Sequence, residues 1–368
     1  MTGRPPPARR GFALAVALFA VVLIGALVAG VLFAARQAMR MDSNVRDAAR
    51  ALAAAEAGLA AALDGGRLPS LAPGEMSAFA GSLPSGTGSF AGTVLRLNRA
   101  IFLVRSSGTD AGGLSRRSVA WLVRPAPVAL PADATLSVTD ELVVGPGSSV
   151  DGGDSPPDAS CPPAGGAVPG ILLGPAASLD LAGCADSSCV RGAPPVRLAG
   201  AAEESASRAA AAAARAALAA SGGKVYDAAE APLERPGAVG SAAACDTSVR
   251  GNWGGAAVPA CARYFPIVHA RGNLSVLGGS GQGVLLVDGD LTVDGGFTFD
   301  GPVLVGGRLI VQGAGARFRG SVRARSAALT PSAAGSAEFV FSRCALDDAL
   351  LANAPVRPLG ERAWAELY

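Results

Sequence analysis

The hydrophobic pattern of the chain is dominated by one stretch without a charged side chain, from Phe12 to Ala35. Arginines flank it on both sides, Arg9 and Arg10 before it and Arg36 and Arg40 after it. At about 1.5 Å per residue this stretch makes a helix of roughly 36 Å, enough to cross a hydrocarbon core of about 30 Å. A secretory signal peptide is the competing interpretation, but its apolar region has only about 7–15 residues. The pattern therefore predicts a membrane-spanning helix in a lipid bilayer.

Beyond this span the chain continues in helix-favouring residues, and no proline occurs until Pro69. Leu52, Leu59 and Leu63 recur at spacings of seven and four, which gives a narrow apolar stripe suited to one packing partner. The sequence predicts one continuous helix over residues 12–63, whose second half lies outside the membrane against a folded body.

The start of the span has a further pattern. A short basic leader, residues 1–11, ends in Gly11, and Phe12 opens the apolar stretch. This junction resembles the site that a prepilin peptidase cuts in type IV pilins. The resemblance implies processing between Gly11 and Phe12, with methylation of the new amino terminus.

A more specific likeness extends over about the first 63 residues. The segments Arg10–Leu14, Asn44–Asp47 and Ala54–Leu59 resemble the PilX-type minor-pilin N-terminal segment. Major pilins carry a glutamate where this chain has Val16, and tip-located minor pilins and pseudopilins also lack it. The resemblance implies a minor pilin-like subunit in the assembly of a type IV pilus or related filament, at its tip. The implied partners are other pilins and minor pilins, the inner-membrane assembly platform and the prepilin peptidase.

All six cysteines follow the span, and an even number of them fits an oxidising compartment. They are Cys161, Cys184, Cys189, Cys245, Cys261 and Cys344. Lysine and arginine are balanced on the two sides of the span and do not choose its orientation. The cysteines therefore favour a single-pass inner-membrane protein with a periplasmic body, or a place in a pilus on the cell surface.

Two local disulfides, Cys184–Cys189 and Cys245–Cys261, are the natural pairings by spacing, although six cysteines permit many connectivities. Zinc is the alternative for the first pair. The chain has one histidine and no second close pair of cysteines, so a zinc site is disfavoured.

Composition indicates the rest of the fold. With 49 glycines and 26 prolines the chain is turn-rich, and an alanine-rich helix interrupts its strands. The expected fold class is α+β: a long N-terminal hydrophobic pilin-like helix, a small antiparallel sheet and a β-solenoid-like C-terminal region. A loop is expected over residues 64–86. An antiparallel meander follows over 87–125, with strands at Phe90–Leu97, Ile101–Ser106 and Ser118–Arg124, and can receive the outer half of the helix.

A repeat indicates the architecture of the C-terminal region. Asn273–Val276, Asp290–Val293 and Arg308–Val311 share one pattern and follow each other at steps of 17 and 18 residues. A short strand and a glycine corner at this step predict a parallel β-solenoid over residues 266–343. Antiparallel hairpins at the Asp-Gly and Gly-Gly pairs are the alternative.

Four further segments complete the expected organisation. Residues 133–200 are a β-rich segment with loops, whose strands resemble further rungs, and residues 201–222 are an alanine-rich helix. Residues 225–265 are an excursion containing Cys245 and Cys261. Residues 344–368 are a C-terminal cap, whose helix is expected to close the open end of the solenoid.

Residues for catalysis are sparse. His269 is the single histidine and is interpreted as structural. Gly278–Gly283 resembles a phosphate-binding loop but lacks the following lysine and helix. Four aspartates cluster in one repeat, and their alternation argues against a calcium site. These are Asp288, Asp290, Asp294 and Asp300.

The net charge of +2 gives no reason to expect a nucleic-acid partner. We therefore expect no enzymatic activity, no cofactor and no metal. The alternative to a pilus subunit is a single-pass membrane-anchored β-solenoid scaffold or adhesin that is not incorporated into a fibre.

Overall fold

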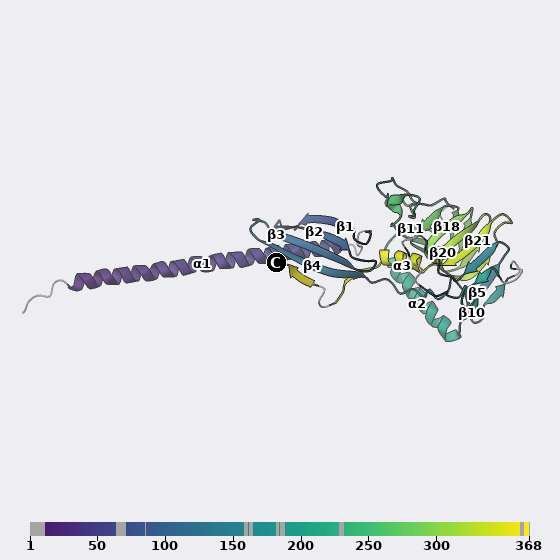
Figure 1. The fold of residues 1–368 in the computed structure, drawn as a ribbon, viewed down its shortest axis with the longest axis horizontal. Coiled ribbons are helices and arrows are strands. Elements are labelled where there is room, and N and C mark those ends of the chain that lie inside the picture. Colours follow the sequence, from purple (N-terminus) through teal and green to yellow (C-terminus); the bar gives the residue numbers. More distant parts are fainter. Residues whose placement is uncertain are drawn as a thin grey trace, which may run out of the picture.

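The computed structural model has a mixed helix-and-sheet architecture, in which a long amino-terminal helix leads into a folded body (Figure 1). The residues that it describes are 12–63, 71–84, 86–157, 161, 165–181, 184, 188–227, 232–360 and 364–367. Among them, six strands form an antiparallel sheet and 17 strands form a curled parallel sheet. The leader of residues 1–11, with Gly11, lies outside the described residues.

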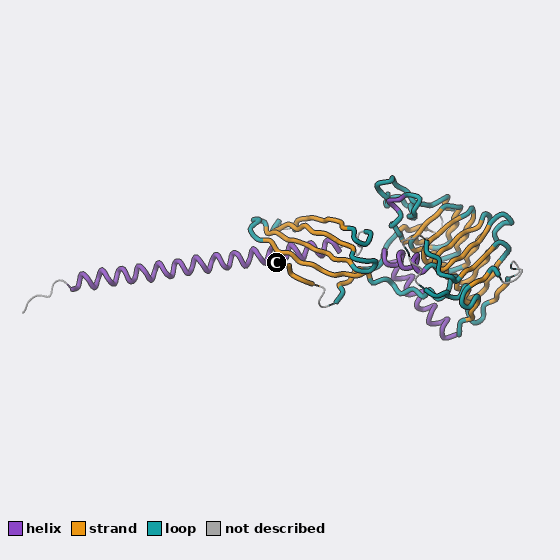
Figure 2. The backbone as a smooth tube through the Cα atoms, viewed as in Figure 1, coloured by secondary structure: helices purple, strands orange, loops and turns teal. Residues whose placement is uncertain are grey.

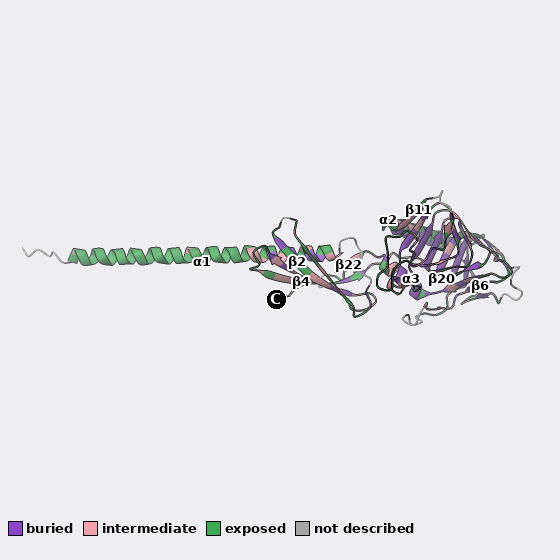
Figure 3. Cartoon of the chain, turned by 90° about the horizontal axis from the view of Figure 1, so that it is seen from above, coloured by how far each residue is buried: buried purple, intermediate pink, exposed green. Residues whose placement is uncertain are grey.

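The long helix α1 runs without interruption over Phe12–Leu63. Its amino-terminal part projects away from the body and is exposed on all sides, whereas its last turns lie against the antiparallel sheet (Figures 1 and 3). The absence of proline and the run of alanine, leucine and valine explain why one helix continues from the apolar stretch into the body.

The antiparallel sheet has the order β1-β2-β3-β4-β22, with β23 also paired to β4. Its strands are β1 (Met76–Ser82), β2 (Gly88–Arg96), β3 (Phe102–Asp110), β4 (Arg116–Pro125), β22 (Val356–Pro358) and β23 (Trp364–Leu367). The expected loop over 64–86 is therefore wrong for the residues of β1. Every residue of β1 is exposed or half-buried, so it lacks a buried alternation, and pairing with β2 fixes its conformation.

The carboxyl-terminal segment also joins this sheet. Val356 lies opposite Pro125, and Trp364 lies opposite Trp121, so β22 and β23 both extend β4. The expected cap over 344–368 is thus divided between a helix on the curled sheet and two strands of the other sheet. Since these pairings join residues more than 200 positions apart, the local pattern does not encode them.

Small residues bring α1 close to the sheet. Ala51, Ala54 and Ala55 are fully buried beneath β3, and Leu59 adds the one large buried side chain of this face. Gly108 of β3 lies directly against the helix backbone, where a Cβ atom would overlap the carbonyl oxygen of Ala51. Backbone contact of this kind fixes the helix on the sheet by shape rather than by large apolar area.

The curled parallel sheet is built from short strands in three columns. Its strands are β5 (Leu136–Val144), β6 (Ser148–Asp151), β7 (Ile171–Leu173), β8 (Ser178–Asp180), β9 (Val190–Arg191), β10 (Val196–Leu198), β11 (Lys224–Asp227), β12 (Leu233–Glu234), β13 (Ile267–Arg271), β14 (Leu274–Leu277), β15 (Ser280–Gln282), β16 (Val284–Val287), β17 (Leu291–Asp294), β18 (Phe297–Val305), β19 (Arg308–Val311), β20 (Gly315–Leu329) and β21 (Ser336–Phe341). Figure 2 shows these strands stacked side by side as successive layers.

The predicted repeat corresponds to neighbouring layers. Leu274 of β14 lies opposite Leu291 of β17, which lies opposite Leu309 of β19, and both pairings are parallel. The antiparallel hairpin alternative is therefore wrong for these strands. All three leucines are buried in the core that the layers enclose, because leucine and valine recur at the same place in each layer.

Aromatic residues fill the wider part of this core. Phe297 and Phe299 stack on each other, and Trp253 meets both rings edge-on. Trp253 is fully buried, and its indole nitrogen donates a hydrogen bond of 2.9 Å to the hydroxyl of Tyr226. The excursion that contains Cys245 and Cys261, with the short 3₁₀ helix at Pro259–Cys261, is anchored to the layers in this way.

The order of the layers differs from the order of the chain. The first layer to form along the chain, β5, pairs with β20 of the last one, with Val322 opposite Leu136. From β5 the stack continues through β7 to β10 at one end, and from β20 through β18, β16 and β13 to β11 at the other. The chain therefore enters and leaves the stack at its middle.

Helix α2 (Ala201–Ala220) connects the two ends of the stack. The seven strand spacings from β10 to β11 span about 34 Å, and a helix of 20 residues spans about 30 Å, so the lengths match. Its contacts follow the layers in turn: Arg323 of β20 meets Ser207, and Ile267 of β13 clusters with Leu218. The alanine-rich helix thus covers one column as a crossover connection.

Helix α3 (Arg343–Ala352) begins with Ser342, whose hydroxyl accepts a hydrogen bond from the backbone of Ala345. Ala349 packs with Leu286 and Leu304 on the outer side of the column, in the middle of the stack. The expectation that this helix closes an open end is wrong. The reason is the layer order, because the last layer is covered by the first one and has no open end to cap.

Three disulfides join all six cysteines. The structure pairs Cys184 with Cys189 and Cys245 with Cys261, the local pairings that spacing favours. The third bond joins Cys161 to Cys344 across a sequence separation of 183 residues. It fastens the proline-rich insert to the start of α3.

We expect Gly108→Ala to destabilise the body by about 1–3 kcal/mol, because the added methyl group forces α1 away from β3. Thermal denaturation of the full chain in detergent measures this effect. Gly251→Ala is the matched control, since a Cβ at Gly251 meets nothing within 4 Å. Equal melting temperatures for the two variants would show that the close helix–sheet contact is not a constraint.

The disulfides are expected to differ in their contribution to stability. In the chain-entropy model a loop of 183 residues corresponds to about 5 kcal/mol and a loop of five residues to about 2 kcal/mol. Replacing Cys161 and Cys344 by serine should therefore lower the denaturation midpoint more than replacing Cys184 and Cys189. The reverse order would mean that Cys161–Cys344 does not restrict the unfolded chain.

Candidate functional site

The amino-terminal half of α1 is the largest exposed apolar surface of the described residues. Phe12, Leu14 and Phe33 are 77%, 73% and 71% exposed, and the apolar side chains between them are similarly bare. Within the described residues this is the one helix long and apolar enough to cross a membrane, and none of its most apolar window is buried. A helix that is apolar on all sides is stable only where lipid or other helices surround it.

A charged collar ends this apolar surface. Arg46 pairs with Asp42, and Arg50 pairs with Asp47 at 3.3 Å, one helical turn apart in each case. These side chains are largely exposed, so the pairs add little to stability. Their position matters more, because they mark where the surface of α1 changes from apolar to polar, just before the helix reaches the sheet.

Phe12 is the first residue of α1, so the predicted processing junction lies at the free end of the apolar surface. Gly11, the other residue of that junction, lies outside the described residues. Val16 is half exposed on the same surface, in the position where major pilins carry glutamate. The described part of the junction is thus an apolar end without a carboxylate.

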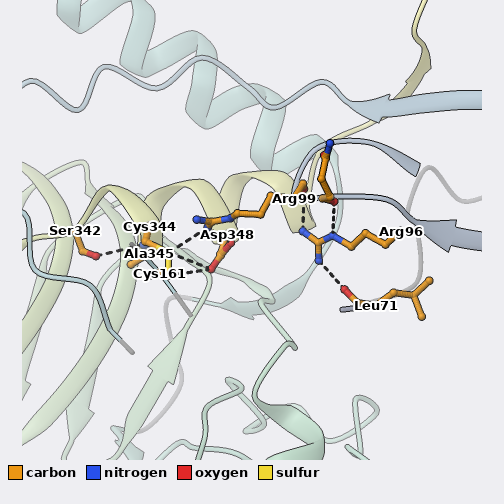
Figure 4. A network of polar contacts seen from close by, with 9 residues as sticks. Leu71, Arg96, Arg99, Cys161, Ser342, Cys344, Ala345 and Asp348 are labelled. Carbon is orange, nitrogen blue, oxygen red and sulfur yellow. Dashed lines mark hydrogen bonds and ion pairs between the residues drawn. A yellow bond between two sulfur atoms is a disulfide. The ribbon is translucent and has the colours of Figure 1, made fainter. Parts of the chain in front are cut away.

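The two sheets meet at a polar junction that sequence reasoning missed (Figure 4). Arg99, in the turn between β2 and β3, donates to Asp348 of α3 at 2.6 Å and to the sulfur of Cys344 at 3.1 Å. Arg96 donates to the carbonyl oxygens of Leu71 and Arg99 at 2.6 and 2.8 Å. No local signal could have revealed this contact, since Arg99 and Asp348 lie 249 positions apart.

Burial lowers the pKa of Arg96, and the nearby Asp348 carboxylate acts against that shift. The guanidinium of Arg96 still donates to two carbonyl oxygens of its own turn and to Leu71. A second connection lies beside it, where the backbone nitrogen of Ala126 donates to Pro355 at 2.8 Å. The entering and leaving strands are therefore held together at the junction.

His269 lies on the outer side of β13. Its Nε2 atom is 3.0 Å from Asp288 Oδ2, and the other oxygen of Asp288 is 3.2 Å from Arg215 of α2. This arrangement links α2 to two layers of the sheet, which is a structural arrangement of charges. All cysteines are in disulfides, so no free thiol lies beside the histidine.

The clustered aspartates have separate partners. Asp290 accepts from the backbone of Arg308 at 2.7 Å, and Asp294 accepts from Gly295 at 2.6 Å. In the described part of the chain, the one group with metal-ligand spacing is Cys161, Cys344 and Asp348. Its two sulfurs form a disulfide and are not available as thiolate ligands.

The glycine-rich segment Gly278–Gly283 forms a corner of the curled sheet, between β14 and β15. Gly278, Gly279 and Gly283 have positive φ angles of 69°, 92° and 109°, which suits glycine at a tight turn. A strand rather than a helix follows this corner, so no helix amino terminus is aimed at an anion there.

Comparison with known proteins adds little. No family model matches the chain, and no curated protein matches it. Among solved structures, the crystal structure of the competence-associated pilin ComZ from Thermus thermophilus is similar over 88% of this chain and 97% of that one, at 14% identity and a TM-score of 0.22. A TM-score this low supports no argument about fold or function.

The apolar surface of α1 gives a direct prediction. Ile24→Arg places a charge in the centre of the apolar stretch, where the cost on the insertion scale is about 2.5–3.5 kcal/mol. We expect less of this variant in alkali-washed membranes than of the natural chain. Gln37→Arg, beyond the stretch, is the matched control and should remain membrane-bound; equal retention of both variants would contradict a spanning role.

Proposed function

We propose that this chain is a minor pilin-like structural subunit that takes part in the assembly of a type IV pilus or a related filament. The observation that carries the proposal is the division of α1 into two halves. Its amino-terminal half is apolar and exposed on all sides, and its carboxyl-terminal half is buried against an antiparallel sheet. Such a helix can be held by a bilayer first and by neighbouring apolar helices afterwards.

Assembly from the membrane requires release of the helix end. The junction of Gly11 and Phe12 suits cleavage by a prepilin peptidase, followed by methylation of Phe12, as the likeness to the PilX-type segment implies. After cleavage the basic leader is gone, and the remaining end of α1 carries no charged side chain before Arg36. The amino-terminal half can then leave the bilayer without drawing a charged side chain through it.

The body supports a position at the filament tip. We propose that the curled parallel sheet is a β-solenoid, because its layers repeat in parallel register at steps of 17 and 18 residues. It lies beyond the antiparallel sheet, in the direction in which α1 points (Figure 1). With α1 along a filament axis, the solenoid would occupy the space of the next subunit, which favours the last position.

The three disulfides support a periplasmic or extracellular body, since such bonds persist in oxidising compartments. The proposed partners are other pilins along the apolar half of α1, the inner-membrane assembly platform and the prepilin peptidase. The body itself is proposed to have a structural role, without catalytic turnover.

The proposal predicts that the chain is recovered with sheared filaments. Gly11→Asp should stay in the membrane fraction with its leader attached, because a charged bulky residue blocks the cleavage site, whereas Gly11→Ala should be processed in part. An antibody against the body, applied to sheared and membrane fractions, measures the distribution.

Gly30→Ala is the control, since it changes a glycine of the same helix where a Cβ meets nothing within 4 Å. Recovery of Gly11→Asp in filaments at the natural level would refute the role of the junction. A natural chain that never leaves the membrane would indicate an anchored scaffold or adhesin instead.

A further inference from the structure

A cleft lies between α2 and the curled sheet. It has a volume of about 460 Å³, which is within the range of small-molecule sites. Four of its lining residues are arginines, two from α2 and two from β20, and one lining residue is acidic. These are Arg208, Arg215, Arg323, Arg325 and Asp140.

One of the four arginines has a structural task. Arg215 donates to the carbonyl oxygens of Val287 and Leu304 at 2.9 and 2.8 Å and pairs with Asp288 at 3.2 Å. Its guanidinium therefore joins α2 to two layers of the sheet and forms one wall of the cleft. The positive charge of Arg215 is already balanced by Asp288.

Arg323 is in a different situation. One of its terminal nitrogens donates to the hydroxyl of Ser207, and its Nε atom is buried without a hydrogen-bond partner among the described residues. Burial lowers the pKa of Arg323, and the charge of Glu204 acts against this shift. A guanidinium that has lost its water and contacts a neutral hydroxyl is stabilised by an anion that reaches its free donors.

The other two arginines can adapt to a ligand. The side chain of Arg208 is 69% exposed and lies at 3.4 Å from Glu204, which is a loose contact. Arg325 is exposed at the rim on the same strand as Arg323. Between these cations the wall is apolar, formed by the buried residues Ala211 and Val305.

We propose that this cleft binds a small organic anion, a carboxylate or phosphate ester, whose charged group contacts Arg323 and Arg325 and whose apolar part lies against Ala211 and Val305. Two arginines from one strand present their donors to a single anionic group, as planar guanidinium groups do in carboxylate and phosphate sites. This site is independent of the pilus role, because α1 does not contribute to it.

Isothermal titration of the full chain in non-ionic detergent tests the site. The probes are phenyl phosphate and phthalate, which share an aromatic ring and differ in the anionic group, and benzyl alcohol, which has no charge. We expect one of the two anions to bind in a one-to-one ratio, with affinity that falls as sodium chloride is raised. The anion that binds more tightly identifies the phosphate or the carboxylate class.

The variants Arg323→Gln and Arg325→Gln should each weaken this binding about tenfold or more, since each removes charged donors. Arg317→Gln is the matched control: Arg317 lies on the same strand, pairs with Glu338 at 2.9 Å and does not line the cleft. If Arg323→Gln does not fold, the exposed Arg325 and Arg208 carry the test.

Three outcomes would overturn the proposal. The first is that neither anion binds at millimolar concentration. The second is that benzyl alcohol binds as well as the anions, which would make the contact purely apolar. The third is that Arg317→Gln weakens binding as much as Arg325→Gln, which would mean that overall charge, and not the cleft, attracts the anion.

Discussion

The apolar surface of α1 is the constraint on which the rest of the structure depends. A leucine, valine or phenylalanine side chain gains about 1.5–3 kcal/mol when it leaves water, and the amino-terminal half of α1 presents such side chains on every side. The protein body covers none of them. It instead holds the other half of the helix rigidly through Ala51, Ala54 and Gly108, so the exposed half is presented at a fixed angle to a bilayer or to other helices.

The body solves a second problem, which is how to attach a long stack of layers to this helix through one narrow junction. Because the first layer pairs with the last, the chain enters and leaves the stack at its middle, next to α3. Both connections then meet at the junction, where Arg99 pairs with Asp348 and Ala126 pairs with Pro355. Helix α2 is the consequence of this order, since something has to connect the two ends.

Local patterns allowed part of this structure to be predicted. The uncharged stretch after Gly11 predicted α1, and the leucines at 274, 291 and 309 predicted parallel layers, because both patterns repeat over neighbouring residues. The order of the layers, strand β1, the side position of α3 and the contact of Arg99 with Asp348 depend on pairings between distant residues. The cleft arginines were missed for the same reason, since α2 and β20 are more than 100 residues apart.

The central claim is that α1 is a processed pilin-like helix, and the amino-terminal residue of the mature natural chain tests it most directly. Mass spectrometry of membrane fractions from cells with and without the prepilin peptidase gives that residue. The account predicts a methylated chain that starts at Phe12 when the peptidase is present and an unprocessed chain that starts at Met1 when it is absent. A start at Met1 in both would contradict it and leave a membrane-anchored protein.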